Sequence, residues 1–413
     1  MNQPSPEWRA ENAGIIQYCL ALCAALALAV FVGIFTNATP PKWDGQSYVD
    51  MARVGITGNP NLQAPFAYRP AVPLLAGELS KRLSITVEES FRLIGRVAAV
   101  LFSLAVFALS QRFARRPADA FVVVVLVGLL YQHLKYPLFF YTLIDVAAFP
   151  LIIMAFLLLV SRRLPAALAV SSVGVLFKEF LAIPLLLVIL QYADAWRRDR
   201  SAGNFLKALS AAVVGAAAVL LPRTLIHVSS TAQWLDPLND IGTLQQLYRM
   251  PADPLRWVNI LYNECGYWLP TLLLLTRERL AKVWQDLEAL NLKAIFAGFF
   301  ALDFVLTMYG GTNTFIFASY AVPLQVVILT LLLRRGVPWT EIVFAVAALL
   351  LFNRIFWPIP LPDPVQPDIA GSEPFIDFYA GWASRVTVST LTRTVEMMAL
   401  LGGAFMLRRW RRA

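Results

Sequence analysis

Long apolar runs separated by short polar segments dominate the hydropathy pattern of this chain. Most runs approach the roughly 20 residues that a helix needs to cross the hydrocarbon core of a bilayer. The pattern therefore predicts an all-α polytopic membrane protein with about 12 membrane segments. The runs occupy residues 13–36, 93–110, 119–131, 142–160, 165–177, 180–192, 206–222, 258–275, 294–309, 314–333, 339–357 and 386–407.

One apolar region, residues 165–192, is interrupted in its middle by Lys178 and Glu179. Each arm has about 13 residues, which as a helix is only about 20 Å long and does not span comfortably. The arms form either a thin helical hairpin with the charges at its outer tip or a re-entrant pair that holds them below the surface. In the re-entrant case the expected number of spans falls to about 10.

The composition supports this class and excludes a soluble protein. The 413 residues are 58% hydrophobic and 15% charged, with a mean hydropathy of +0.62. We expect a single integral membrane domain over residues 1–413, whose first run stays in place because no signal-peptide cleavage pattern precedes it. The three cysteines, Cys19, Cys23 and Cys265, have neither disulfide nor metal spacing.

Basic residues gather at every second boundary between apolar runs. With the N-terminus inside, 20 of the 35 lysines and arginines fall in inner segments, whereas most acids fall outside. Because cytoplasmic loops retain positive charge, both termini are expected to be cytoplasmic. The pI of about 9.6 then reflects membrane topology and does not indicate nucleic-acid binding. Richness in Arg and Ala with sparse Cys suits a bacterial inner membrane.

The long polar segments lie on the outer side, at residues 37–92, 223–257 and 358–385. Thr86 and Glu89 have the spacing of a helix N-terminal capping motif, which predicts an outer juxtamembrane helix that runs into the second span. The closely spaced prolines of 358–364 exclude a helix and predict a rigid outer cover. The function is therefore expected on the outer face.

Asp44 is the strongest candidate for chemistry. It follows the first apolar run and precedes Gly45, which allows close approach of another group. A carboxylate in this place is suited to act as general base if its surroundings raise its basicity. Nearby, Tyr68 and Arg69 offer a hydroxyl and a guanidinium whose fork suits phosphate oxygens. An Asp-Gly turn and a surface arginine are the structural alternative.

Charges at the edges of other apolar runs are further candidates, because charge is costly in hydrocarbon. Asp145 begins the fourth run, where capping of the helix is an equally good explanation. Lys135 lies in the preceding loop and is placed to face an anionic head group. Lys178 and Glu179 either serve function or neutralise each other; adjacent helical residues point about 100° apart and need not pair.

Four motifs together resemble the GT-C class of polytopic glycosyltransferases, over roughly the first 190 residues and in the right order. They are Trp43-Asp44-Gly45-Gln46-Ser47-Tyr48, Pro65-Phe66-Ala67-Tyr68-Arg69-Pro70, Thr142-Leu143-Ile144-Asp145 and Phe177-Lys178-Glu179-Phe180. The resemblance implies a polyprenyl-phosphate sugar as donor and Asp44 as the catalytic base. It further implies that Asp145 contacts acceptor or sugar and that Lys178, with Glu179 beside it, contacts the donor phosphate.

A single displacement with inversion fits this layout. Asp44 would deprotonate an acceptor hydroxyl, while Lys178 with Arg69 or Arg385 stabilises the leaving phosphate. The remaining expected substrate contact is Tyr48. The acceptor is a glycan, a lipid or a protein.

Two departures from the class concern the donor and the metal. Gly310-Gly311-Thr312-Asn313-Thr314 has no acid and arginine where many related bacterial enzymes carry them. The first outer segment has no Asp-x-Asp, so no metal ligand is assigned and a divalent cation stays possible without being required.

Three other functions remain open. A secondary transporter or flippase for a lipid-linked or anionic substrate would also have about 12 spans, with Asp303 and Arg393 inside later ones. A polymerase or ligase acting on lipid-pyrophosphate glycans has closely related chemistry. A non-catalytic scaffold would tolerate neutral residues at Asp44, Lys178 and Glu179.

Overall fold

The computed structural model describes residues 6–228, 230–231, 251–309, 314–361, 378 and 386–411. This part of the chain is helical apart from a two-residue parallel pairing of β1 (Gln63–Ala64) with β2 (Ser230–Thr231). The all-α class predicted from the sequence is therefore confirmed.

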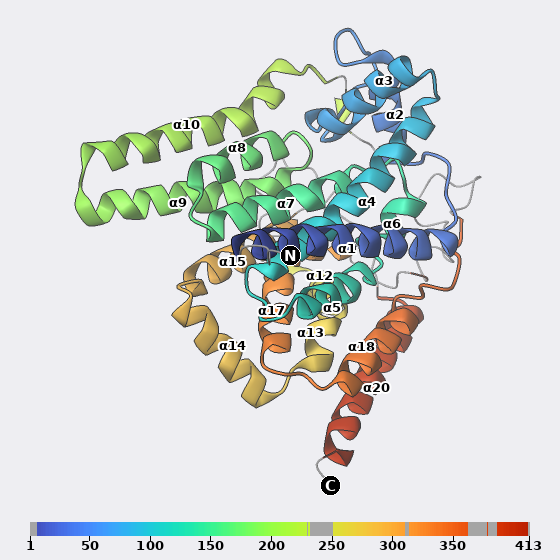
Figure 1. Cartoon of the computed structure of the whole chain (residues 1–413). Helices are drawn as coiled ribbons and strands as arrows, with labels where there is room; N and C mark the ends of the chain where they lie inside the picture. The colour runs from blue at the N-terminus through green and yellow to red at the C-terminus, as the bar shows by residue number, and fades with distance from the viewer. Residues whose placement is uncertain are drawn as a thin grey trace, which may run out of the picture.

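The helices of the first half form a bundle around α4, with two outer helices at one of its ends (Figure 1). They are α1 (Pro6–Ile34), α2 (Asp44–Val54), η1 (Phe66–Tyr68), α3 (Ala71–Leu83), α4 (Val87–Gln111), α5 (Pro117–Gly128), α6 (Lys135–Phe139), α7 (Asp145–Val160), α8 (Leu164–Gly174), η2 (Glu179–Leu181), α9 (Ala182–Asp199) and α10 (Ala202–Leu225).

The second half adds α17 to the core and carries α18 and α20 along one side (Figure 1). Its helices are α12 (Pro254–Tyr267), α13 (Leu269–Leu274), α14 (Arg277–Ala289), α15 (Lys293–Tyr309), α16 (Thr314–Phe317), η4 (Ala318–Ala321), α17 (Val322–Arg334), α18 (Trp339–Phe352) and α20 (Val388–Trp410).

Among the described residues, five helical segments are long and apolar enough to cross a membrane. They are Gly14–Ile34, Val87–Gln111, Glu179–Asp199, Ala202–Leu225 and Thr314–Arg334. The pair α14 and α15, bent by 109° at its break, would make a sixth. This agrees with a multi-pass membrane protein.

The number of such segments is smaller than the 12 or 10 expected from the apolar runs, because several runs fold into helices that are too short to span. Four runs fold as apolar helices of only 10–17 residues, namely α5, α7, α8 and α18. At 1.5 Å per residue, even the longest of them reaches only about 24 Å, which is less than the roughly 30 Å hydrocarbon core.

Helix α4 starts where the capping motif predicts. The Thr86 side chain accepts a hydrogen bond from the Glu89 backbone, and the Glu89 side chain accepts one from the Thr86 backbone. The helix then continues without a break to Gln111, so the predicted helix start and the second apolar run form one continuous helix. Its buried face packs against α7, α1 and α5, whereas Val97 and Leu101 remain exposed.

The interrupted region 165–192 forms two separate helices that contact each other, α8 and α9. Lys178 is extended between them, and η2 prolongs α9 to give the 21-residue segment Glu179–Asp199. One arm is therefore long enough to span, whereas the other, α8, has 11 residues. Gly174 permits the tight connection, because a Cβ there would lie 2.0 Å from the Leu181 side chain.

The three long polar segments differ in how far they can be described. In residues 37–92, the backbones of α2 and α3 approach closely at Gly77. A Cβ on this glycine would lie only 2.3 Å from the Ala52 carbonyl oxygen. Most of 223–257 and 358–385 lies outside the described residues. The start of the proline-rich stretch, 358–361, is non-helical as predicted, and both backbone groups of Ile359 are bonded to the Asn37 side chain.

Candidate functional site

Five charged residues singled out from the sequence come together near the N-terminal end of α7. We call Asp44, Arg69, Asp145, Lys178 and Glu179 the charged cluster. Two ion pairs tie four of them together. Arg69 donates two hydrogen bonds to the Glu179 carboxylate, at 2.7 and 2.5 Å. The Lys178 ammonium lies 3.0 Å from Asp145 Oδ1. Lys178 and Glu179 thus take different partners and do not neutralise each other.

Local backbone features hold Arg69 at the cluster. The residue ends η1 and is followed by Pro70, and the next amide, of Ala71, donates to the Leu176 carbonyl just before Lys178. The guanidinium is 8% exposed and donates a third hydrogen bond to the Tyr48 hydroxyl at 3.0 Å. A buried arginine with all of these contacts is a fixed positive charge.

Asp44 is brought to the cluster by a close approach of backbones. It is the first residue of α2, and a Cβ on the next residue, Gly45, would lie 2.2 Å from Thr142 Oγ1. Thr142 is three residues before Asp145, so this contact sets α2 against the start of α7. Trp43, just before Asp44, has a φ of 52°, a strained value for a residue other than glycine.

The electrostatics of Asp44 differ from those of the other acids in the charged cluster. In the described part of the chain it forms no ion pair, whereas Asp145 and Glu179 each have one. Burial raises the pKa of Asp44 from 3.8 to about 6, the Asp145 charge adds to this rise, and Lys178 and Arg69 oppose it. A carboxylate with such a pKa is ionised at neutral pH and more basic than an ordinary aspartate, as a general base requires.

Sequence reasoning missed Tyr320, which lies in η4 of the second half. Its hydroxyl donates to Asp145 Oδ1 at 2.8 Å, so Asp145 is bonded to both Lys178 and Tyr320. The Tyr320 ring stacks on Phe180, with 4.3 Å between the centroids. Nothing marks this tyrosine in the sequence, because it stands in an apolar run where aromatic residues are common.

Other expected contacts lie apart from the charged cluster or cannot be placed. Lys135 is fully buried, and its ammonium donates to the carbonyls of Arg354, Ile355 and Trp357, which follow α18. Tyr68 is half-buried, with the Arg223 guanidinium 5.4 Å from its ring centre. Arg385 and Asn313 lie outside the described residues.

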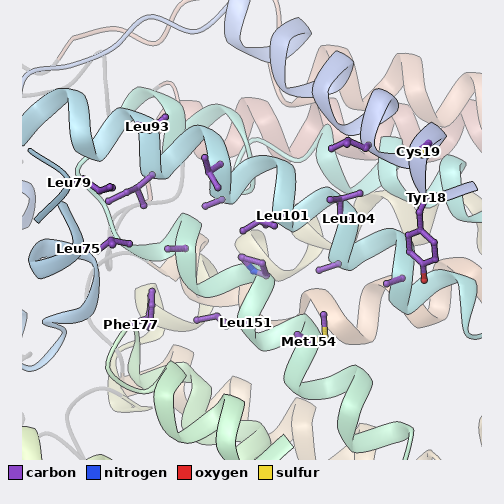
Figure 2. A pocket seen from close by; sticks show the side chains of 18 of the residues that line it. Tyr18, Cys19, Leu75, Leu79, Leu93, Leu101, Leu104, Leu151, Met154 and Phe177 are labelled. Carbon is purple, nitrogen blue, oxygen red and sulfur yellow. The ribbon is translucent and has the colours of Figure 1, made fainter. Parts of the chain in front are cut away.

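A long apolar groove ends beside the charged cluster. Its volume is about 1430 Å³, and α1, α3, α4 and α7 supply most of its lining. Figure 2 shows it extending from Tyr18 and Cys19 of α1 along Leu101 to Leu75 and Phe177. Phe177 directly precedes Lys178, so this end of the groove adjoins the backbone that carries the charged cluster.

No group of three or more His, Cys, Asp or Glu side chains within the described ranges is arranged to hold a metal ion. No protein-family model, curated protein or solved structure matches the chain. What the site can do therefore rests on its geometry: a basic carboxylate beside two fixed cations, at the end of a groove suited to hydrocarbon.

Proposed function

We propose that this protein is a membrane glycosyltransferase of the GT-C type. It would move a hexosyl or pentosyl group from a polyprenyl-phosphate donor to the hydroxyl of a glycan, lipid or protein acceptor. The observation that carries this proposal is the charged cluster at the end of the apolar groove. Such a site suits a substrate that has a phosphate on a long hydrocarbon chain.

The reaction is a single displacement at the anomeric carbon. Asp44 takes the proton of the acceptor hydroxyl, and the hydroxyl oxygen bonds to the anomeric carbon from the face opposite the phosphate. The bond from this carbon to the phosphate oxygen breaks, and its electron pair stays on the lipid phosphate. Lys178 and Arg69 stabilise the charge that develops there, so the sugar is transferred with inversion.

Glu179 and Asp145 hold the two cations in position, and Asp145 also binds the sugar. Glu179 holds the Arg69 guanidinium in one plane, and Asp145 holds the Lys178 ammonium. Remaining acceptor positions on Asp145 and the Tyr48 hydroxyl are suited to sugar hydroxyl groups. A divalent cation is not needed in this scheme, since the two side chains supply the positive charge.

The proposal includes a topology. We propose 12 membrane segments, or 10 with a re-entrant 165–192, both termini in the cytoplasm and the charged cluster on the periplasmic face of a bacterial inner membrane. Arginines in the last turns of α9, α17 and α20 support this orientation, because cytoplasmic ends of membrane helices retain positive charge. Labelling of single cysteines in intact cells tests it: one introduced at Asn61 should react, and one at Arg411 should not.

The function is tested with purified protein, a synthetic polyprenyl-phosphate hexose and extracted cell-envelope acceptors. Asp44→Asn should lower the transfer rate by about 10²–10⁴-fold, because the base is lost. Asp50→Asn, on the same helix α2, is the matched control and should keep activity. Unchanged transfer by Asp44→Asn at equal expression would refute the assignment of the base.

One observation favours a second candidate, a transporter or flippase. Asp303 is 1% exposed in α15, and no ion pair within the described residues involves it. Uncompensated acids inside membrane segments are typical of transport pathways. Substrate-dependent uptake or lipid flipping in vesicles that is lost in Asp303→Asn and kept in Asp44→Asn would favour this function over glycosyl transfer.

A further inference from the structure

A second, smaller cavity lies where the start of α14 meets the last turns of α20, far along the chain from the charged cluster. Its volume is about 350 Å³, in the lower range of small-molecule sites. Its lining includes Thr276, Arg277, Glu278, Phe405, Arg408 and Arg409. Three arginines and a single acid make the cavity strongly positive.

The protein itself leaves much of this positive charge uncompensated. Arg408 is anchored, since it donates to the carbonyls of Leu273 and Leu275 at 3.2 and 3.0 Å. It also lies 3.7 Å from the buried Glu341, an acid that is bonded twice to Arg279, at 2.7 and 2.9 Å, so its charge is partly compensated. Arg277 and Arg409 are exposed and have no ion pair with any residue that the structure describes. The cavity therefore has the charge to attract an anion.

The surroundings of the cavity are those of a membrane boundary. Phe405 and Met406 are each 61% exposed and Trp410 is 76% exposed, all on the final turns of α20. Exposed apolar side chains next to arginines, followed by a tryptophan, are typical of a helix end that passes from hydrocarbon to head groups. An anion bound here would carry hydrocarbon chains of its own.

We propose that this cavity binds the phosphate of an anionic membrane phospholipid, with its acyl chains along Phe405 and Met406. The arginine guanidinium presents paired donors that match phosphate oxygens. Basic pockets between membrane helices bind acidic lipid head groups by the same chemistry. This site is separate from the charged cluster and does not depend on the proposed glycosyl transfer.

The test measures lipid retention by native mass spectrometry of the full chain, delipidated and then exposed to vesicles of phosphatidylglycerol or phosphatidylcholine. Phosphatidylglycerol should be retained preferentially, and Arg277→Ala with Arg409→Ala should weaken its binding about tenfold or more. The control Arg112→Ala with Arg115→Ala removes two exposed arginines away from the cavity and should leave binding unchanged. Arg277→Lys with Arg409→Lys keeps both positive charges and should retain most of the phosphatidylglycerol binding.

Three results would overturn the proposal. The first is equal retention of the two phospholipids, and the second is equal loss of binding in the control variant. The third is inorganic phosphate displacing the lipid with comparable affinity, which would assign the cavity to a soluble anion. Thermal unfolding of each variant distinguishes lost binding from lost fold, and the lysine variants keep the charge if the alanine variants prove unstable.

Discussion

The charged cluster and the interior of the second half both contain buried aspartates, and the surroundings of these aspartates differ. In the charged cluster, Asp145 and Glu179 each lie within 3.0 Å of a cation, and Asp145 also accepts from Tyr320. In the interior of the second half, Asp303 is 1% exposed, yet one of its oxygens has no hydrogen-bond partner among the described residues. An ionised carboxylate without a partner costs several kcal/mol in such a place.

This difference indicates that the ion pairs of the charged cluster serve to hold its charges in place. Ion pairs formed by residues far apart in the chain keep four charges in fixed positions at the end of an apolar groove. Asp303 has no comparable support, so a neutral side chain should serve equally well there. Variants at each region test this contrast.

The largest effect is expected from breaking the Lys178–Asp145 pair. Lys178→Met leaves Asp145 buried without its cation and should lower the free energy of unfolding by about 3–5 kcal/mol. Thermal unfolding in detergent measures this, with Lys282→Met on the exposed face of α14 as the control, expected within about 0.5 kcal/mol. Adding Asp145→Asn should recover much of the loss; no recovery would show that the pair is not its source.

A smaller effect is expected where α2 meets the start of α7. Gly45→Ala places a Cβ against Thr142 Oγ1 and should destabilise the protein by about 1–3 kcal/mol, displacing Asp44 as well. Gly95→Ala in α4 is the matched control: nothing lies within 4 Å of its Cβ, and it should stabilise by about 0.5–1 kcal/mol. Combining Gly45→Ala with Thr142→Gly should restore transfer activity, and failure to do so would argue against the steric explanation.

The pH dependence concerns Asp44, the acid of the charged cluster without an ion pair. Burial raises its pKa to about 6, so transfer should fall about tenfold per pH unit below that value as the base is protonated. Its folded pKa exceeds the unfolded one, so its contribution to stability is greatest at low pH and decreases as the pH rises from about 4 to 6. A profile of kcat/KM that stays flat down to pH 5 would contradict the assignment.

The smallest effect is expected from Asp303→Asn. Because no ion pair within the described chain is lost, the change in unfolding free energy should stay within about 1 kcal/mol, and glycosyl transfer should continue. Asp145→Asn, tested in parallel, should destabilise by several kcal/mol because Lys178 loses its partner. Equal destabilisation by the two variants would remove the distinction between the regions.

Much of the fold and of the site could be predicted from local pattern. Apolar runs indicated the helices and the membrane class, and the cap at Thr86 marked the start of α4. Charges at the edges of apolar runs pointed to Asp145, Lys178 and Glu179, because such charges stand out against hydrocarbon, and the polar segment after the first run pointed to Asp44 and Arg69. Local pattern failed for Lys135, whose ammonium bonds carbonyls more than 200 residues further along the chain.

The number of helices long enough to span could not be predicted from hydropathy. An apolar run has the same hydropathy whether it folds into a membrane-spanning helix or into a short helix packed inside the bundle. Helix α7 is of the second kind. The apolar groove could not be predicted either, since its lining comes from four helices, α1, α3, α4 and α7, that are brought together only by the fold.

Residue order alone determined which segments are apolar, where their helices begin and which charges stand at their ends, since these depend on neighbours within a few turns. Tertiary packing decided the partners: Arg69 meets Glu179 across 110 positions, and Asp145 meets Tyr320 across 175. Many distant residues could neutralise a given charge, and only the packing of η1, α7, η2 and η4 selects among them.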